Sequence, residues 1–266
     1  MAAFSIERDG DIALVTMLAP SMGREFFHEL PQVFRDLDAD SGVRAIVLGG
    51  SGDNFSFGLD LKDVAPLFAP LGTGSASASD RTKLLAQVRE WQASLTAVAN
   101  CRTPIISAID GWCIGGGIDV VAATDIRLAT TSAKFSVRET KVAIVADLGS
   151  LQRLVGIIGD GHLRELALTG GDIDAARAER IGLVNSVYRD ADALHTAALE
   201  LANEIAANSP LVVRGVKDVL DAERAPRVEA GLRYVAAWNA AFLPSQDLGE
   251  AFAAFAEKRT PKFTGE

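Results

Sequence analysis

Residues 113–119 read CIGGGID and place a carboxylate two positions after three consecutive glycines. Glycine inside an element costs about 0.5–1 kcal/mol relative to alanine, so the run indicates a specific requirement. A phosphate-binding P-loop needs Lys and then Ser or Thr after its last glycine, whereas IDVV follows here. A dinucleotide fingerprint begun at Gly115 would want a third small residue where Val120 stands. Neither phosphate-binding motif is therefore favoured.

Two interpretations of the glycine run remain. In an oxyanion hole, glycines let backbone N–H groups at a helix N-terminus approach a carbonyl oxygen closely, and Asp119 would face the same pocket. Close packing of a helix on a strand also requires small residues. A second glycine-marked turn, DNFSFGLDLKD (53–63), follows the apolar stretch RAIVLGG (44–50). Because an oxyanion hole usually takes its two donors from separate segments, the second turn favours the catalytic interpretation.

The elements that must position these turns follow an α/β pattern. FSIER and DIALVTM flank Asp9-Gly10 as a hairpin, residues 44–50 and 104–110 read as buried strands, and helical spacing covers 24–40 and 83–98. Residues 66–80 read as a long loop rich in Gly, Ser, Ala and Pro. After about residue 148 the pattern is helical throughout. The order predicts an α/β core over 1–200 and a helical subdomain over 201–266.

Composition limits the possible partners and compartment. The 266 residues are 48% hydrophobic with a net charge of −9, which disfavours a nucleic-acid or anionic-membrane surface. No apolar run reaches the roughly 20 residues of a membrane span, and the start, MAAFSIERDGDIALV, lacks a basic leader followed by an apolar stretch. We therefore expect a cytoplasmic protein that binds neither nucleic acid nor membrane.

Cysteine and histidine give no metal motif. Cys101 and Cys113 lie in apolar surroundings and are expected to be buried free thiols, while the three histidines are far apart in the sequence. We expect no metal site and no separate cofactor.

FSFGLDLKDV, IDGWCIGGGIDVVAATDIRLAT and LGSLQRL together resemble the enoyl-CoA hydratase/isomerase (crotonase) superfamily over nearly the whole chain. The resemblance implies a crotonase-like α/β spiral of ββα units, with C-terminal helices used to form a homotrimer or a dimer of trimers. It also implies an acyl-CoA substrate whose thioester oxygen accepts from the backbone N–H groups of Leu59 and Gly116. Such an oxyanion hole stabilises the enolate that forms when a proton next to the thioester is lost.

The acids select the reaction within the superfamily. Hydratases carry glutamates at the positions of Asp119 and Glu139, and the shorter Asp119 weakens a hydratase interpretation. Asp147, in ADLGSLQRL, completes a set that resembles the Δ3,5,Δ2,4-dienoyl-CoA isomerase branch, as does LRYVAAWNAAFLPSQDL (232–248). The resemblance implies Asp147 as the base at C2, Glu139 as the acid at C6 and Asp119 in electrostatic support.

Alternatives stay open for these acids and for the activity. Asp119 and Asp147 are also suited to a helix N-terminus, and Glu139 to a surface. A 2-enoyl-CoA hydratase and a non-catalytic acyl-CoA-binding homologue are the competing functions.

The acidic chain needs a few placed cations for the phosphates of CoA. The resemblance implies substrate contacts from Gly58, Asp60, Leu61 and Lys62, with Lys258 reaching a neighbouring subunit's ligand. The segment LAPSMGREFF (18–27) is shorter than the family's basic loop, and Arg24 is its candidate substitute.

Overall fold

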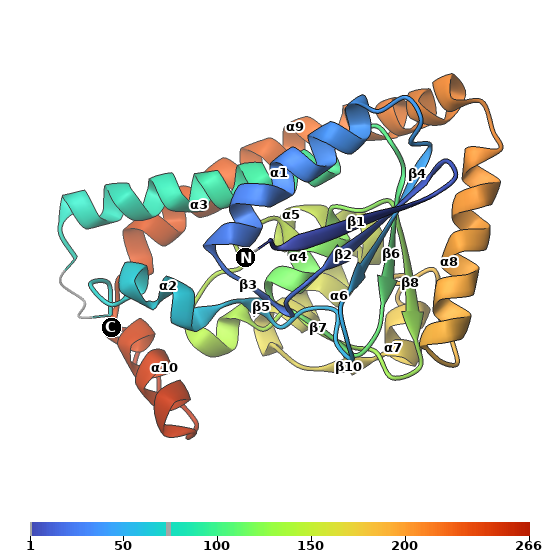
Figure 1. Ribbon diagram of the computed structural model, residues 1–266. Helices are drawn as coiled ribbons and strands as arrows, with labels where there is room; N and C mark the ends of the chain where they lie inside the picture. The colour runs from blue at the N-terminus through green and yellow to red at the C-terminus, as the bar shows by residue number, and fades with distance from the viewer. Residues whose placement is uncertain (1, 73–75) are drawn as a thin grey trace.

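Within residues 2–72 and 76–266, which the computed structural model describes, a six-stranded sheet has the order β1-β2-β4-β6-β8-β11 (Figure 1). The first pair is antiparallel and every later pair is parallel. The predicted hairpin is thus confirmed as the edge of a largely parallel sheet. The strands of this sheet are β1 (Phe4–Asp9), β2 (Ile12–Met17), β4 (Ala45–Gly50), β6 (Ile105–Ile109), β8 (Ile126–Thr130) and β11 (Ser186–Tyr188).

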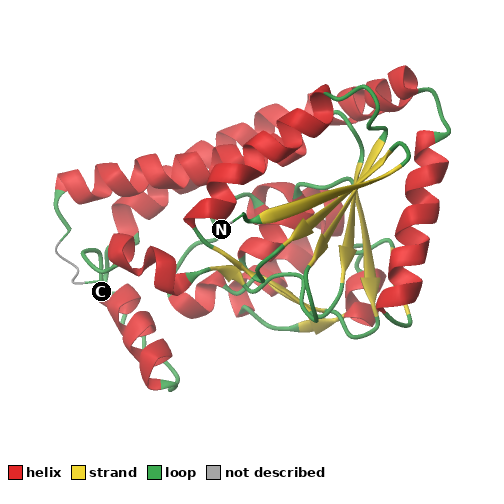
Figure 2. Ribbon diagram, viewed as in Figure 1, coloured by secondary structure: helices red, strands yellow, loops and turns green. Residues whose placement is uncertain are grey.

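Helices cover both faces of this sheet, which explains the almost wholly apolar sequence of β4. On one face, Val47 and Ile106 pack against alanines of α8 (Ala191–Ala206) at four-residue spacing, Ala198 and Ala202. The larger core lies on the opposite face, under α1 (Arg24–Ala39), α3 (Ala78–Ala99) and α4 (Gly116–Ala122). Figure 2 shows the helices on either side of the strands of this sheet.

Two small sheets carry the glycine turns. One has the order β10-β9-β7, formed by β7 (Trp112–Ile114), β9 (Lys134–Ser136) and β10 (Ile173–Asp174). The other pairs β3 (Ser21–Met22) with β5 (Gly58–Leu59). The turn after β4 and the turn after β6 therefore end in neighbouring short strands.

The remaining helices form the outer layers of the molecule. They are α2 (Leu61–Phe68), the 3-10 turn η1 (Glu139–Val142), α5 (Ser150–Arg153), α6 (Val155–Thr169), α7 (Ala175–Arg180), α9 (Pro210–Phe242) and α10 (Gln246–Glu257). The long α9 runs beside α1 and α3, while α10 lies at the opposite end from α8, near α2 (Figure 1). In the part of the chain that is described, no helix is both long and apolar enough to cross a membrane.

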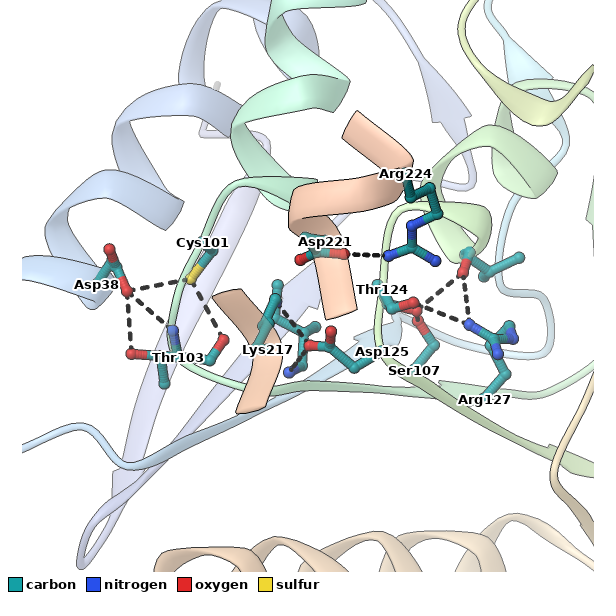
Figure 3. Close-up of polar contacts among 12 residues, drawn as sticks. Asp38, Cys101, Thr103, Ser107, Thr124, Asp125, Arg127, Lys217, Asp221 and Arg224 are labelled. Carbon is teal, nitrogen blue, oxygen red and sulfur yellow. Dashed lines mark hydrogen bonds and ion pairs between the residues drawn. The ribbon is translucent and has the colours of Figure 1, made fainter. Parts of the chain in front are cut away.

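A buried ion pair fixes α9 against the sheet (Figure 3). Lys217 Nζ lies 2.7 Å from Asp125 Oδ2, and the same oxygen accepts from the Ile105 backbone N–H at 2.8 Å. Lys217 is buried, so α9 is attached where β6 begins. Both cysteines are buried free thiols, as predicted.

Two predictions about secondary structure were wrong in part. The expected loop over 66–80 is shorter: α2 continues to Phe68, and a capping box between Ser77 and Asp80 starts α3. Residues 73–75 of that prediction lie outside the described residues. The chain after residue 148 is not purely helical, because β10 and β11 add strands too short to show a periodicity. The division at residue 200 stays a prediction, and that residue lies within α8.

Candidate active site

Backbone pairing brings the two glycine turns together. Ser56 N–H donates to the Trp112 carbonyl at 2.8 Å and Ile114 N–H donates to the Ser56 carbonyl at 3.0 Å, so the chain before Gly58 runs parallel to the chain before Gly116. Gly58 has φ +79°, and a Cβ there would lie 2.8 Å from the Gly116 nitrogen. Only glycine permits this approach.

Each of the three consecutive glycines meets a different requirement. Gly115 has φ +54°, in the left-handed region, and its carbonyl accepts from Ile118. A Cβ on Gly116 would lie 3.1 Å from Met22 Sδ, and one on Gly117 would lie 2.9 Å from the Ser56 Cβ. The glycine run therefore allows both close packing against Met22 and Ser56 and the close approach of its backbone to the Gly58 turn.

Leu59 and Gly116 line one cavity. Gly116 is the first residue of α4, where backbone N–H groups have no partner within the helix. Leu59 lies opposite Met22 in the β3–β5 pair, and the Met22 carbonyl accepts from the backbone N–H of Asp60. Because successive N–H groups of a strand point to opposite sides, the N–H of Leu59 points away from β3. Two backbone donors can thus serve one oxygen atom in the cavity.

The cavity has a volume of about 630 Å³ and is mostly apolar. Its walls come from β5, α2, α3, α4, η1 and the two C-terminal helices. The apolar side chains that line it include Phe57, Leu61, Phe68, Val88, Trp91, Ile114, Val142, Ile144, Leu148, Leu243 and Phe255. All three predicted acids, Asp119, Glu139 and Asp147, also line it. The catalytic roles predicted for these acids stay predictions.

Asp119 is the most deeply buried of the three acids, with 1% of its surface exposed. Its Oδ1 accepts from the Ser150 backbone N–H at 2.5 Å, so Asp119 rather than Asp147 contacts the N-terminus of α5. Burial raises its pKa to about 6, and the Ser150 hydrogen bond and the Arg153 charge oppose that rise. Asp119 therefore stays ionised more readily than the other two acids.

Asp147 precedes α5 and is held by two amide side chains. Asn239 Nδ2 donates to its Oδ2 at 2.6 Å, and Gln92 Nε2 donates to its backbone carbonyl at 2.7 Å. Burial raises the pKa of Asp147 to about 7; the Asn239 hydrogen bond lowers it and the Asp119 charge raises it further.

Glu139 begins η1 and faces the cavity beside the glycine run, with its Oε1 3.6 Å from the Cβ position of Gly115. Its Oε2 is buried, and no described residue hydrogen-bonds to it. Burial raises its pKa to about 8, and the charges of Asp119 and Asp147 add to that rise. Glu139 therefore holds its proton to higher pH than Asp147, which lines the same cavity.

Some of the residues predicted to contact CoA line the cavity and others do not. Lys62, Asp60 and Leu61 line the cavity near its β5 side, and Asp60 caps α2 by accepting from the Lys62 backbone N–H at 3.0 Å. Lys258 follows α10 and does not line the cavity within the described residues. Arg24 pairs with Asp63 at 3.1 Å, so its charge is already partnered.

Three residues that line or support the site were missed by the sequence analysis. Asn239 and Gln92 hold Asp147, and Arg138, which forms an ion pair with Asp172, lines the cavity next to Glu139. Asn239 is a polar residue on the buried face of α9, where its neighbours Val235, Ala236 and Ala240 are apolar. That interruption of a helical stripe is the signal that would have identified it.

No cluster of three or more potential metal ligands occurs among residues 2–72 and 76–266.

Comparison with known proteins places the chain in a family. The model of the enoyl-CoA hydratase/isomerase family matches residues 7–266, and the chain belongs to that family. A mitochondrial Delta(3,5)-Delta(2,4)-dienoyl-CoA isomerase of Dictyostelium discoideum is 47% identical over 91% of this chain and 83% of its own length. A peroxisomal protein of the same name from Arabidopsis thaliana is 40% identical over 91% and 87%. The crystal structure of an enoyl-CoA hydratase/isomerase from Pseudoalteromonas atlantica superposes with a TM-score of 0.84 at 27% identity, covering 98% of this chain and all of the other.

These comparisons confirm the predicted crotonase-like fold and contradict the predicted cytoplasmic location. The two curated relatives are named as a mitochondrial and a peroxisomal protein. The cytoplasmic prediction rested on the composition of the first residues and on the lack of a long apolar run, and neither observation distinguishes the cytoplasm from an organelle interior.

Proposed function

We propose that this chain is a Δ3,5,Δ2,4-dienoyl-CoA isomerase, which converts a 3,5-dienoyl-CoA into a 2,4-dienoyl-CoA. The observation that carries the proposal is the pair Glu139 and Asp147 at one apolar cavity, beside the amides of Leu59 and Gly116. The names of the two curated relatives support it.

The reaction removes a proton at C2 and adds one at C6. Ionised Asp147 removes a proton from C2, and the electron pair forms an enolate whose oxygen accepts from the N–H groups of Leu59 and Gly116. The diene shifts along the chain as protonated Glu139 donates its proton to C6. The cycle leaves Asp147 protonated and Glu139 ionised, and proton exchange with solvent restores both. No separate cofactor takes part, since CoA belongs to the substrate.

Asp119 distinguishes this proposal from a 2-enoyl-CoA hydratase. A hydratase needs a carboxylate that is free to activate water, whereas Asp119 Oδ1 is used by the Ser150 N–H at 2.5 Å. Its charge instead raises the pKa values of Glu139 and Asp147. This electrostatic role keeps one of the two acids protonated near neutral pH.

We assign the CoA side of the cavity to Asp60, Leu61 and Lys62, which line it, and propose that the Lys62 ammonium binds a phosphate. Gly58 does not line the cavity itself, and we assign it to the same side because it directly precedes Leu59, which does. Lys258 is assigned to the ligand of a neighbouring subunit, because it does not line its own cavity in the described part of the chain. This assignment requires an oligomer, which we propose to be a homotrimer or a dimer of trimers. The exposed apolar residues of α9 support that assembly.

A panel of 3,5-dienoyl-CoA and 2-enoyl-CoA substrates of several acyl lengths tests the proposal. We expect the absorbance of a thioester-conjugated diene to grow with the 3,5-dienoyl substrates, and little water addition to crotonyl-CoA. Efficient hydration of crotonyl-CoA would instead establish a hydratase. Binding of these thioesters without turnover would indicate a non-catalytic acyl-CoA-binding homologue.

A further inference from the structure

Asn239 connects the C-terminal helix α9 to the carboxylate of Asp147. It is 1% exposed and lies near the C-terminal end of α9, between the buried residues Ala236 and Ala240. Its Nδ2 donates to Asp147 Oδ2 at 2.6 Å and to the Val145 carbonyl at 2.9 Å. One side-chain amide thus uses both of its hydrogens on the 145–147 segment.

The direction of these hydrogen bonds matters for the chemistry. The Val145 carbonyl can only accept, so the atom shared by the two bonds must be the NH₂ group of Asn239 rather than its oxygen. Asp147 Oδ2 is therefore an acceptor, and a hydrogen bond to a carboxyl oxygen favours the ionised form of the group. The second oxygen, Oδ1, is left for the cavity that Asp147 lines.

The charges around Asp147 make this donor necessary. The titratable groups that act on the site are Asp119 on α4 and Glu139 on η1, both carboxyl groups, and Arg153 on α5, which acts on Asp119. The Asp119 charge and burial both disfavour an ionised Asp147; the Asn239 hydrogen bond is the larger of the two interactions that oppose them, and a hydrogen bond from the Asp147 backbone is the other.

We infer that Asn239 is a positioning residue of the reaction: it holds Asp147 ionised and directs the free carboxylate oxygen at C2 of the substrate. This inference rests on the proposed isomerase function for its catalytic part. Its electrostatic part, the effect of Asn239 on the ionisation of Asp147, stands without turnover and is tested separately.

The first test compares the wild type with Asn239→Ala and with Asn239→Leu, which fills nearly the same volume without a donor. Loss of the donor moves the acid limb of kcat/KM to higher pH. We expect kcat/KM to fall about 10- to 30-fold at pH 6 and less than about 3-fold at pH 9, with KM nearly unchanged. A residue with only a structural role would lower activity equally at both pH values.

The matched control is Val235→Ala, one turn earlier on the same buried face of α9. It removes packing and keeps Asn239, so its pH profile should follow the wild type. If both Asn239 variants fold and their pH profiles coincide with that of Val235→Ala, the inference is wrong.

The second test measures the Asp147 carboxyl directly by ¹³C NMR, with its resonance assigned through Asp147→Asn. We expect its pKa to rise in both Asn239 variants, whether or not dienoyl-CoA is a substrate. A raised pKa in a protein that does not isomerise 3,5-dienoyl-CoA would overturn the proposed function and keep the electrostatic role. An unchanged pKa would overturn the role of Asn239 even in an active isomerase.

Discussion

Gly58 and Gly116 approach so closely that a Cβ on Gly58 would lie 2.8 Å from the Gly116 nitrogen. The same Cβ would lie 2.9 Å from the Ile114 carbonyl oxygen. Any larger residue at position 58 must therefore separate the two turns, which carry the amides proposed as the oxyanion hole. This contact makes the geometry of the hole depend on a glycine that contributes no side chain.

Gly58→Ala tests that dependence. The substitution strains a backbone with φ +79° and pushes the Gly116 amide away, so we expect kcat/KM to fall about 100-fold or more. The control is Gly52→Ala, which has a similar φ of +81° but nothing within 4 Å of its Cβ position. Gly52→Ala should lose about 1–2 kcal/mol of unfolding free energy in denaturant titrations, and Gly58→Ala should lose more, because its Cβ also meets backbone atoms. Equal kinetics in the two variants would argue against the oxyanion hole.

Glu139→Gln and Asp147→Asn remove the proposed acid and base while keeping side-chain size. We expect each to lower kcat for 3,5-dienoyl-CoA by roughly 10²- to 10⁴-fold with little change in acyl-CoA affinity, measured by calorimetry. Glu179→Gln, at an exposed position on α7, is the control for the same chemical change. Near-normal turnover in either cavity variant would contradict the assigned roles.

The pH dependence of the wild type follows from the same two groups. The base works when ionised, above the pKa of about 7 of Asp147, and the acid works when protonated, below the pKa of about 8 of Glu139. A narrow bell in kcat/KM with its maximum between these values is expected, and its limbs belong to the interacting pair. Stopped-flow or steady-state rates from pH 5 to pH 10 check this. A rate that rises steadily to the alkaline end would exclude a protonated acid.

The sequence predicted the parts of the site that lie within short motifs. Gly58, Leu59 and Gly116 fall in two glycine turns that follow apolar strands, and the structure brings those turns together. Local pattern sufficed there because strand, turn and helix start are contiguous in the chain. Whether the amides perform the predicted function stays a prediction.

Contacts between distant residues were not predictable in the same way. Asp119 accepts from Ser150 at the N-terminus of α5, 31 residues later in the chain. From the sequence, the nearby Asp147 was a candidate for that contact. Asn239 contacts Asp147 across 92 residues. Partners such as these are chosen by tertiary packing, which leaves no periodicity in the sequence. The two- and three-residue strands β10 and β11 were missed because an element of that length shows no alternation.

Asp119→Asn separates the charge of Asp119 from its hydrogen bond. The amide oxygen of Asn can still accept from Ser150, while the charge that raises the pKa values of Glu139 and Asp147 is lost. We therefore expect both limbs of the pH profile to move to lower pH by roughly one unit, with unfolding free energy changed by less than about 1 kcal/mol. Asp119→Ala, which also removes the acceptor, should lose about 1–2 kcal/mol more. An unshifted profile in Asp119→Asn would contradict the electrostatic role.

The exposed aromatic residues of α9 give the last prediction. Tyr234, Trp238 and Phe242 follow one another at four-residue spacing, with ring centroids 6.4 Å and 4.5 Å apart, and 42–70% of each is exposed. A row of three large exposed rings on one helix is typical of an interface between subunits. Burial of these rings would supply the apolar core of the proposed trimer contact.

The double variant Trp238→Arg/Phe242→Arg places two charges in that row. We expect it to weaken self-association by at least about 100-fold in sedimentation velocity, while circular dichroism shows the same helix content. Leu168→Arg is the control, because Leu168 is 73% exposed on α6, away from α9. It should sediment as the wild type does. A wild type that sediments as a monomer, or a double variant that keeps its oligomeric state, would contradict an interface on this face of α9.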